Sequence, residues 1–125
     1  MGKEPIIIVG GEPNSVFLEI FFKSIKTNTF KSPLIIVVSR KLLEMQMKKL
    51  GFTFKINDID KKLKNLSKLN NNKINLINVD YVFKNCFEKI TSKSNKYISE
   101  SFEIALDIIR RNNLSKFING PISKK

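Results

Sequence analysis

The first residues that could do chemistry form a turn at residues 10–13, Gly-Gly-Glu-Pro, directly after the apolar run at residues 6–9. Glycine adopts backbone angles that are closed to other residues, and proline fixes φ, so the chain turns sharply here. Ligands of α/β proteins bind at the end of the sheet where such turns lie. Gly11, Glu12 and Pro13 are therefore candidate residues of a cofactor-binding or substrate-binding cleft.

Other interpretations of this first turn stay open. It is neither a phosphate-binding P-loop nor a full GxGxxG fingerprint, since no third glycine follows, and a purely structural turn fits it as well. Glu12 could accept a hydrogen bond from a ligand, or it could cap the helix that follows, where its charge meets the helix dipole. Glu19, one turn into that helix, could serve a ligand, helix packing or an ion pair.

A second turn at residues 119–124 reads Asn-Gly-Pro-Ile-Ser-Lys. Asn119, Gly120 and Lys124 are its candidate site residues, because a lysine beside a Gly-Pro turn can contact an anionic substrate or cofactor. The alternative for Lys124 is a solvated lysine.

The types of residue that are missing exclude several kinds of chemistry. The chain has no histidine, so it cannot build a histidine-ligated metal site, a Ser-His-Asp triad or an imidazole acid–base pair by itself. Its single cysteine, Cys86, has no cysteine or histidine partner and is interpreted as an ordinary, partly buried thiol. We therefore assign no catalytic residue and no metal ligand within the chain.

The net charge of +12 raises the question of nucleic-acid binding. Only three of the 23 basic residues are arginine, and the lysines are scattered among asparagines and isoleucines. This pattern lacks the clusters of arginine and aromatic residues that grip phosphates and stack on bases. The composition therefore argues against a nucleic-acid-binding protein.

The apolar periodicity predicts alternating strands and helices along the first half of the chain. Residues 5–9 and 33–38 are expected to form buried strands, each followed by a helix, the first from Ser15 to about Lys26 and the second from Ser39 or Arg40 to Gly51. The stripe expected to face the core is Val16, Phe17, Ile20 and Phe21 in the first helix, and Leu42, Leu43, Met47 and Leu50 in the second.

The second half is less regular. Residues 52–56 alternate and predict an edge strand, residues 57–73 a surface excursion with room for a short helix over Leu63, Leu66 and Leu69, and residues 74–79 a strand. Residues 80–93 fit either a loop or a helical turn. A helix from Ser94 or Asn95 to residues 112–113 and a short strand at residues 114–118 complete the pattern, and the core-facing residues of that helix are expected to be Ile98, Phe102, Ala105, Leu106 and Ile109.

This order of elements predicts a single α/β domain over residues 1–125, a three-layer α/β/α arrangement with a parallel or mixed sheet. A hydrophobic fraction of 42% and a charged fraction of 27% are typical of a soluble globular protein. The sequence shows neither a continuous membrane span nor a signal peptide, so we expect no membrane association and a cytoplasmic location.

The two turns and the helix before the second one resemble the 4-hydroxythreonine-4-phosphate dehydrogenase family of vitamin B6 (pyridoxal phosphate) biosynthesis. Residues 11–13 and Glu19 match a strand, a Gly-(Asp/Glu)-Pro loop and a helix glutamate of that family, and residues 119–124 resemble its (Thr/Asn)-(Gly/Ala)-Pro-(Ile/Val)-x-Lys turn. The resemblance spans the whole chain in element order. It implies part of an isocitrate/isopropylmalate dehydrogenase-like fold and, for this chain, the N-terminal portion of a larger two-domain enzyme.

The resemblance further implies an NAD(P)-dependent oxidation of the secondary alcohol of 4-phosphooxy-L-threonine, assisted by a divalent metal, in a homodimer. The family's metal-binding histidines and its phosphate-binding residues follow the Gly-Pro-x-x-Lys turn, where this chain ends, so we expect the 125 residues alone to be inactive. The family's glycine-rich stretch after the first proline is bulkier here, at residues 14–18. The alternative function is a non-catalytic α/β binding or interaction domain. Apolar surface around Phe117, Ile118 and Ile122 is expected to be exposed and to favour association.

Overall fold

A computed structural model describes residues 4–11, 16–27, 32–63, 66–70, 72–81 and 92–120 of the chain. Its centre is a five-stranded sheet in the order β3-β4-β2-β1-β5, in which every pair of neighbouring strands is parallel. The strands are β1 (Ile6–Val9), β2 (Leu34–Val38), β3 (Ile56–Asp58), β4 (Ile74–Asn78) and β5 (Phe117–Asn119). The parallel form of the predicted sheet is therefore confirmed.

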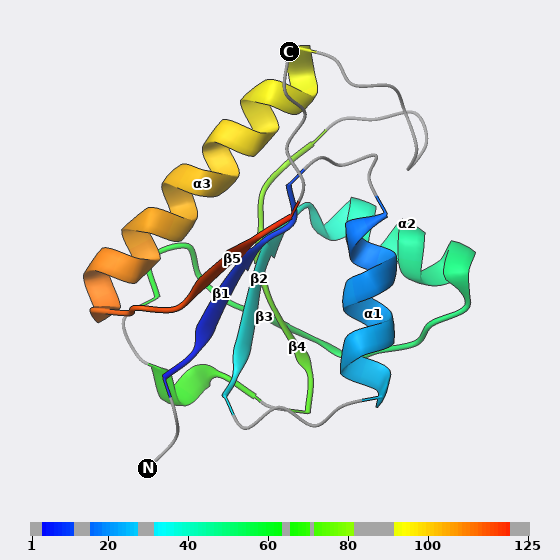
Figure 1. The fold of residues 1–125 in the computed structure, drawn as a ribbon, viewed down its shortest axis with the longest axis horizontal. Coiled ribbons are helices and arrows are strands. Elements are labelled where there is room, and N and C mark those ends of the chain that lie inside the picture. Colours follow the sequence, from blue (N-terminus) through cyan, green and yellow to red (C-terminus); the bar gives the residue numbers. More distant parts are fainter. Residues whose placement is uncertain are drawn as a thin grey trace.

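Helices cover both faces of this sheet. Helix α3 (Ser92–Asn112) lies on one face, and α1 (Phe17–Thr27) and α2 (Arg40–Leu50) lie together on the other (Figure 1). The short 3-10 helix η1 (Leu66–Lys68) lies between β3 and β4 in the chain. This is the three-layer α/β/α architecture that the sequence predicted.

The central strands are buried because their side chains meet a helix layer on both faces. Residues 35–37 of β2 are fully buried, as are Ile7 and Val9 of β1. Strands of this kind carry continuous β-branched runs rather than alternating ones. The two apolar runs that were predicted to form buried strands are therefore β1 and β2 in the middle of the sheet. Strand β1 pairs with β2 on one side and with β5 on the other.

The strand predicted at residues 52–56 is wrong in position, since β3 spans Ile56–Asp58. The alternation of Phe52 and Phe54 has another cause: their rings stack at 5.9 Å, and both rings lie within 6 Å of the buried ring of Phe22 in α1. A connecting segment that packs aromatic rings onto a helix shows the same period as a strand.

The predicted apolar face of α1 is wrong at Val16 and Ile20, and that of α3 is wrong at Leu106 alone. Val16, just before α1, and Ile20 within it are exposed, and the buried side chains of α1 are Leu18, Phe21 and Phe22. Packing against α2 and Phe52 turns Phe22 inward, which moves Ile20 to the outside. In α3, the buried residues include Ile98, Ala105 and Ile108, whereas Leu106 is exposed. The predicted apolar face of α2 is confirmed at Leu42, Leu43 and Met47, which are buried. Gln46 is buried with them, and Leu50 is half-buried.

Several boundaries also differ from the prediction. Helix α3 begins at Ser92 and ends before Asn113, which has a positive φ of 52°. Leu114 is buried behind that helix end, where its N–H donates to Ile109 O at 3.0 Å, so β5 begins only at Phe117. Of the short helix expected over Leu63, Leu66 and Leu69, the structure has the 3-10 turn η1 at Leu66–Lys68, and Leu63 is buried in the core. Cys86 and most of the undecided segment 80–93 lie outside the described residues.

No helix in the described ranges has the length and apolar character needed to span a bilayer.

Candidate functional site

The candidate site lies at the carboxyl ends of the strands. All strands point the same way, so the residues that follow them gather at one edge of the sheet, at the upper end in Figure 1. The two turns of the sequence prediction are brought together here, because β1 and β5 are neighbours and Val9 pairs with Asn119. Residues 110 positions apart in the chain therefore belong to one surface.

One direct hydrogen bond joins the two turns. The Gly120 N–H donates to Val9 O at 2.7 Å, whereas the Gly10 N–H donates to Val37 O at 3.2 Å and ties the first turn to β2. The Asn119 side-chain amide donates to Gly120 O at 3.0 Å. Gly11 has a φ of 72°, in the region that favours glycine.

Gly120 is required for a different reason, namely the close approach of two backbone segments. A Cβ at this position would lie 2.4 Å from Gly10 O and 3.0 Å from Cγ of Phe17. Real Cβ atoms do not approach a carbonyl oxygen that closely, so any side chain here would separate the turns. The ring of Phe17 closes the space beside Gly120 on the α1 side.

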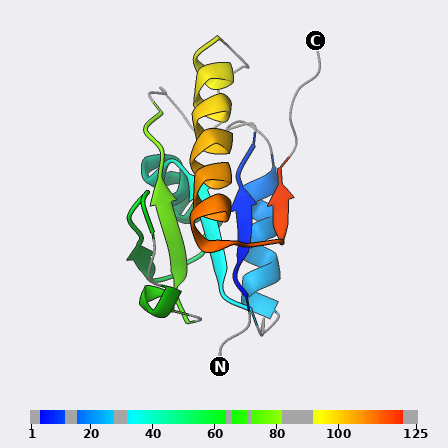
Figure 2. The ribbon, with the colours of Figure 1, turned by 90° about the vertical axis from the view of Figure 1, so that its left-hand side faces the viewer.

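A second part of the same edge lies between β2 and β4. The connection after β2 leads to α2 on one face of the sheet, and the connection after β4 leads to α3 on the other (Figure 2). Open α/β sheets bind ligands at such a change of direction. Ser39 and Arg40 follow β2 at this point, Asn78 is the last residue of β4, and Asp80 follows it.

Hydrogen bonds organise this second region around the start of α2. Ser39 caps the helix, with its Oγ accepting from the Leu42 N–H at 3.3 Å. Oδ1 of Asn78 accepts from the Arg40 N–H at 2.8 Å, and the Asn78 amide donates to Asp80 at 3.2 Å. The end of β4 is thereby tied to the start of α2.

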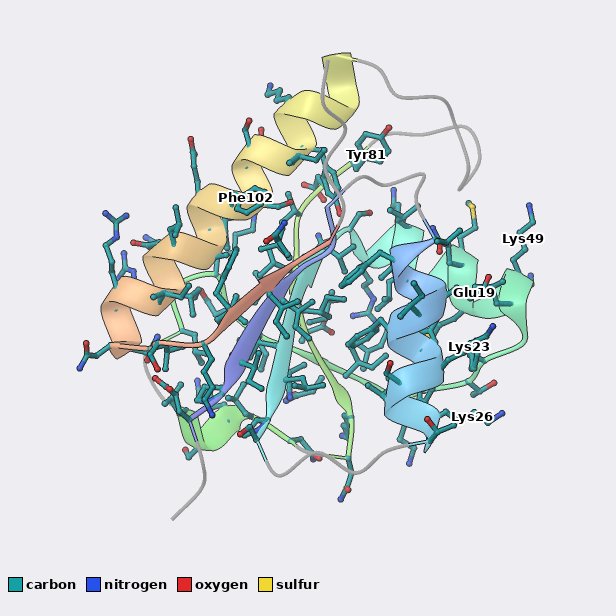
Figure 3. The ribbon with its side chains drawn as sticks, viewed as in Figure 1. Glu19, Lys23, Lys26, Lys49, Tyr81 and Phe102 are labelled. Carbon is teal, nitrogen blue, oxygen red and sulfur yellow. The ribbon has the colours of Figure 1, made fainter. Side chains whose placement is uncertain are left out.

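Tyr97 of α3 completes this arrangement from the opposite face of the sheet. Its hydroxyl oxygen accepts a hydrogen bond from the Ser39 N–H at 2.8 Å, and its ring lies 4.9 Å from that of Tyr81. Tyr81 follows β4 (Figure 3). Burial raises the pKa of the Tyr97 hydroxyl well above its usual value, because the phenolate would be desolvated. Tyr97 is thus a neutral group that fixes the end of β2 against α3.

Charged groups occupy the outer side of this region. Arg40 forms an ion pair with Asp58 at the end of β3, and its Nε lies 3.5 Å from Glu44 of α2. The hydrogen bond to Asp58 raises the pKa of the Arg40 guanidinium. Because Arg40 is engaged by two carboxylates, its charge is largely compensated within the protein.

The structure places some of the predicted site residues and not others. Gly11, Asn119 and Gly120 lie together at the carboxyl ends of β1 and β5, whereas Glu12, Pro13 and Lys124 fall outside the described residues. Glu19 forms an ion pair with Lys23 at 3.0 Å on the exposed side of α1, one of the alternatives left open by the sequence.

The sequence interpretation missed Asn78 and Tyr97 at this edge. The position of Asn78, directly at the end of a predicted strand, could have indicated it. Tyr97 gave no such signal, since its partner Ser39 is 58 residues away.

The described residues do not fit a divalent metal. Among them no group of three or more Cys, Asp or Glu side chains is placed to hold an ion, and the sequence contains no histidine. A metal-assisted reaction would therefore need ligands beyond these residues.

No protein-family model matches the chain, and no curated protein matches its sequence. Among solved structures, a 4-hydroxythreonine-4-phosphate dehydrogenase from Burkholderia phymatum superimposes with a TM-score of 0.76 at 16% sequence identity, over 97% of this chain and 37% of that one.

A structure from Salmonella typhimurium, assigned to the same enzyme, gives a TM-score of 0.78 at 14% identity, over 98% of this chain and 39% of that one. The chain therefore spans about two-fifths of the length of these neighbours. At these identities the likeness concerns the fold, and the 125-residue chain has the fold of a part of 4-hydroxythreonine-4-phosphate dehydrogenases.

Proposed function

We propose that this chain is the N-terminal part of a 4-hydroxythreonine-4-phosphate dehydrogenase, an NAD(P)- and metal-dependent enzyme that oxidises 4-phosphooxy-L-threonine in vitamin B6 biosynthesis. The observation that carries the proposal is the contact between the two turns. Residues of both family-like motifs, Gly11 in one and Asn119 and Gly120 in the other, lie at one edge of a sheet whose fold matches these enzymes.

In this proposal the chain's own residues bind and orient rather than react. The paired turns form one wall of a cleft for the phosphorylated substrate or the nucleotide, and Lys124 supplies a positive charge to it. The metal, when bound to the complete enzyme, polarises the alcohol oxygen and the ketone that forms. No described residue holds it, so the ligands come from the part of the fold that this chain does not cover.

The first test is the activity of the isolated chain. We expect no reduced nicotinamide from 4-phosphooxy-L-threonine, NAD or NADP and Mg²⁺, because the chain has no histidine to bind the metal. Formation of NADH by the purified 125 residues would contradict the proposal that they are an incomplete enzyme.

The second test concerns binding and uses two adjacent lysines as a matched pair. If Lys124 contacts an anionic ligand, Lys124→Ala should weaken NADP or phosphate binding about tenfold, as expected for the loss of one charged hydrogen bond, whereas Lys125→Ala should not. Isothermal titration calorimetry measures both. Equal effects of the two variants would show that only net charge matters and would leave Lys124 without a specific role.

One observation favours the second candidate, a non-catalytic α/β binding or interaction domain. Phe17 belongs to the stretch, residues 14–18, where the family is glycine-rich, and its Cγ lies 3.0 Å from the position of a Cβ at Gly120. A ring here limits how closely a ligand can approach the backbone of the second turn. Saturable ligand binding without turnover, in the presence of the rest of the fold, would support this candidate over the enzyme.

A further inference from the structure

Asn119 and Gly120 form the one asparagine–glycine pair of the sequence. An asparagine side chain loses ammonia when the backbone nitrogen of the next residue attacks its carbonyl carbon. A following glycine favours this reaction, because it has no side chain to obstruct the attack. Asn119 is the exposed last residue of β5, and Gly120 is buried. The reactive pair therefore lies at the contact between the two turns.

The folded structure opposes the reaction at Gly120. The Gly120 N–H donates to Val9 O at 2.7 Å, which holds the proton that the attacking nitrogen has to lose. The peptide group between Asn119 and Gly120 would also have to rotate to bring this nitrogen onto Cγ of Asn119. Space for that rotation is small, because an added Cβ at Gly120 would lie 2.4 Å from Gly10 O and 3.0 Å from Cγ of Phe17. The contact with β1 thus keeps Asn119 unreactive.

Strand β5 has few interactions that hold it in place. It is three residues long, lies at the edge of the sheet, and pairs with β1 alone in the described part of the chain (Figure 2). Ile118 is 48% exposed, and the ring of Phe117 lies 5.8 Å from that of Phe102 in α3. Before the strand, the Glu4 carboxylate accepts from the N–H and from the hydroxyl of Ser115, each at 2.7 Å.

Short elements with few buried contacts open at a lower free energy than the domain as a whole. We therefore expect β5 to detach from β1 while the rest of the sheet stays folded. In the detached strand, the Gly120 nitrogen is released from Val9 O and the peptide group is free to rotate.

We propose that Asn119 is a site of spontaneous deamidation, controlled by the contact of β5 with β1. When β5 detaches, the Gly120 nitrogen forms a bond to Cγ of Asn119, the bond between Cγ and Nδ2 breaks, and ammonia leaves with the proton of the Gly120 amide. Water then opens the cyclic imide at either of its two carbonyl groups. The products are aspartate and isoaspartate at position 119.

Either product weakens the contact between the turns. The Asn119 amide donates to Gly120 O at 3.0 Å, whereas an ionised aspartate cannot donate and places a negative charge beside that oxygen. Isoaspartate adds one methylene group to the main chain, which shifts Gly120 relative to Val9 O. The modification is independent of the proposed function, since it depends only on the contact of β5 with β1.

Peptide mapping by mass spectrometry, with fragmentation that separates aspartate from isoaspartate, measures the rate at position 119 in mildly alkaline buffer. In the chain unfolded in urea, we expect residue 119 to be modified before every other asparagine. In the folded protein the rate should be lower by about tenfold or more, because only the detached fraction reacts. Equal rates in the folded and the unfolded chain would overturn the inference.

Two alanine variants test whether the opening is local. Phe117→Ala removes the ring that packs on Phe102, and we expect it to raise the rate in the folded protein about tenfold and to leave the rate in urea unchanged. Phe54→Ala is the matched control, because that ring packs on Phe22 and Phe52 and not on α3. It should leave the rate at position 119 nearly unchanged. Equal acceleration by the two variants would show that only global unfolding exposes the pair, contrary to the proposal.

A variant outside the core decides the matter if Phe117→Ala does not fold. Glu4→Ala removes both hydrogen bonds to Ser115 and leaves the core intact, so it should raise the rate at position 119 about threefold to tenfold. An unchanged rate in this folded variant would count against control by β5.

The effect of the modification is tested with Asn119→Asp, which stands for the aspartate product. Asn113→Asp is the control, since it adds the same charge at an exposed residue just after α3. We expect hydrogen exchange of the Gly120 amide, followed by NMR, to become about tenfold faster in Asn119→Asp and to stay unchanged in Asn113→Asp. Unchanged exchange in Asn119→Asp would refute the proposed weakening of the contact.

Discussion

At the scale of single residues, two glycines are required for different physical reasons. Gly51 has a φ of 80° and an added Cβ would meet nothing within 4 Å, so Gly51→Ala costs only the backbone strain of the left-handed region, about 1 kcal/mol. Gly120→Ala would place a Cβ 2.4 Å from Gly10 O. We expect it to lower the free energy of unfolding by about 2–3 kcal/mol, as overpacking does.

Urea unfolding of both variants measures this difference, with the native chain as the reference. Equal losses for the two alanines would contradict the close contact of the turns. Because that contact joins the two motifs, the same measurement also tests the geometry on which the proposed function depends.

Tyr97 is the residue that should make stability sensitive to high pH. Its pKa is raised in the folded protein, so above the usual tyrosine pKa of about 10 the unfolded chain loses this proton first. The stabilisation is fully present below that pH and is lost as the pH rises toward the folded pKa. We expect the native chain to lose stability between about pH 9.5 and 11 more steeply than Tyr97→Phe.

The comparison with Tyr97→Phe is needed because lysines also titrate in this range. At neutral pH the variant should be less stable by about 1–3 kcal/mol, because the buried Ser39 N–H loses its acceptor. If the stability of the two proteins fell in parallel at high pH, the pKa of Tyr97 would not be higher in the folded state than in the unfolded chain.

At the scale of elements, the start of α2 depends on its cap. The Ser39 side chain accepts from the Leu42 N–H, and Ser39 itself is almost fully buried. Ser39→Ala should lower the free energy of unfolding by about 1 kcal/mol, whereas Ser39→Gly should cost only a few tenths. Thermal unfolding measures both, and a larger loss for glycine than for alanine would show that the buried Cβ of residue 39 matters more than the capping preference of this position.

The elements also show which parts of the fold can be predicted from sequence. The buried strands β1 and β2 could be predicted because their apolar runs have no other stable arrangement in a chain of this composition. The exposure of Ile20 and Leu106 could not, because the rotation of a helix is set by the partner it packs on, here Phe52 for α1. Local periodicity contains no information on that partner.

The candidate site, too, could be predicted from the sequence only in part. The turns at Gly11 and Gly120 were predictable, since their residue types constrain the backbone directly. Their contact was not, because it follows from β5 crossing to the far side of β1 after α3. The same limit applies to Asn75, a buried side chain that binds Leu34 O, Asn70 and Asn57 and thereby joins three segments of the fold.

At the scale of the whole molecule, the net charge of +12 should weaken the folded state at low ionic strength. Like charges on one surface repel each other more in the compact state than in the unfolded chain. Raising the salt concentration from about 10 mM to about 150 mM shortens the screening length from about 30 to 8 Å. We expect this to stabilise the protein on the order of 1 kcal/mol, or roughly 4 °C in Tm for a chain of this length.

A variant with fewer charges provides the control for this prediction. Substituting glutamine for the exposed Lys48, Lys61 and Lys73 lowers the net charge by three and leaves the paired turns untouched. Its Tm at low salt should be higher than that of the native chain, and its gain on adding salt should be smaller. If salt instead lowers the Tm of the native chain, attractive pairs such as Arg40–Asp58 and Lys23–Glu19 outweigh the repulsion. In that case the excess of lysine would cost the fold nothing.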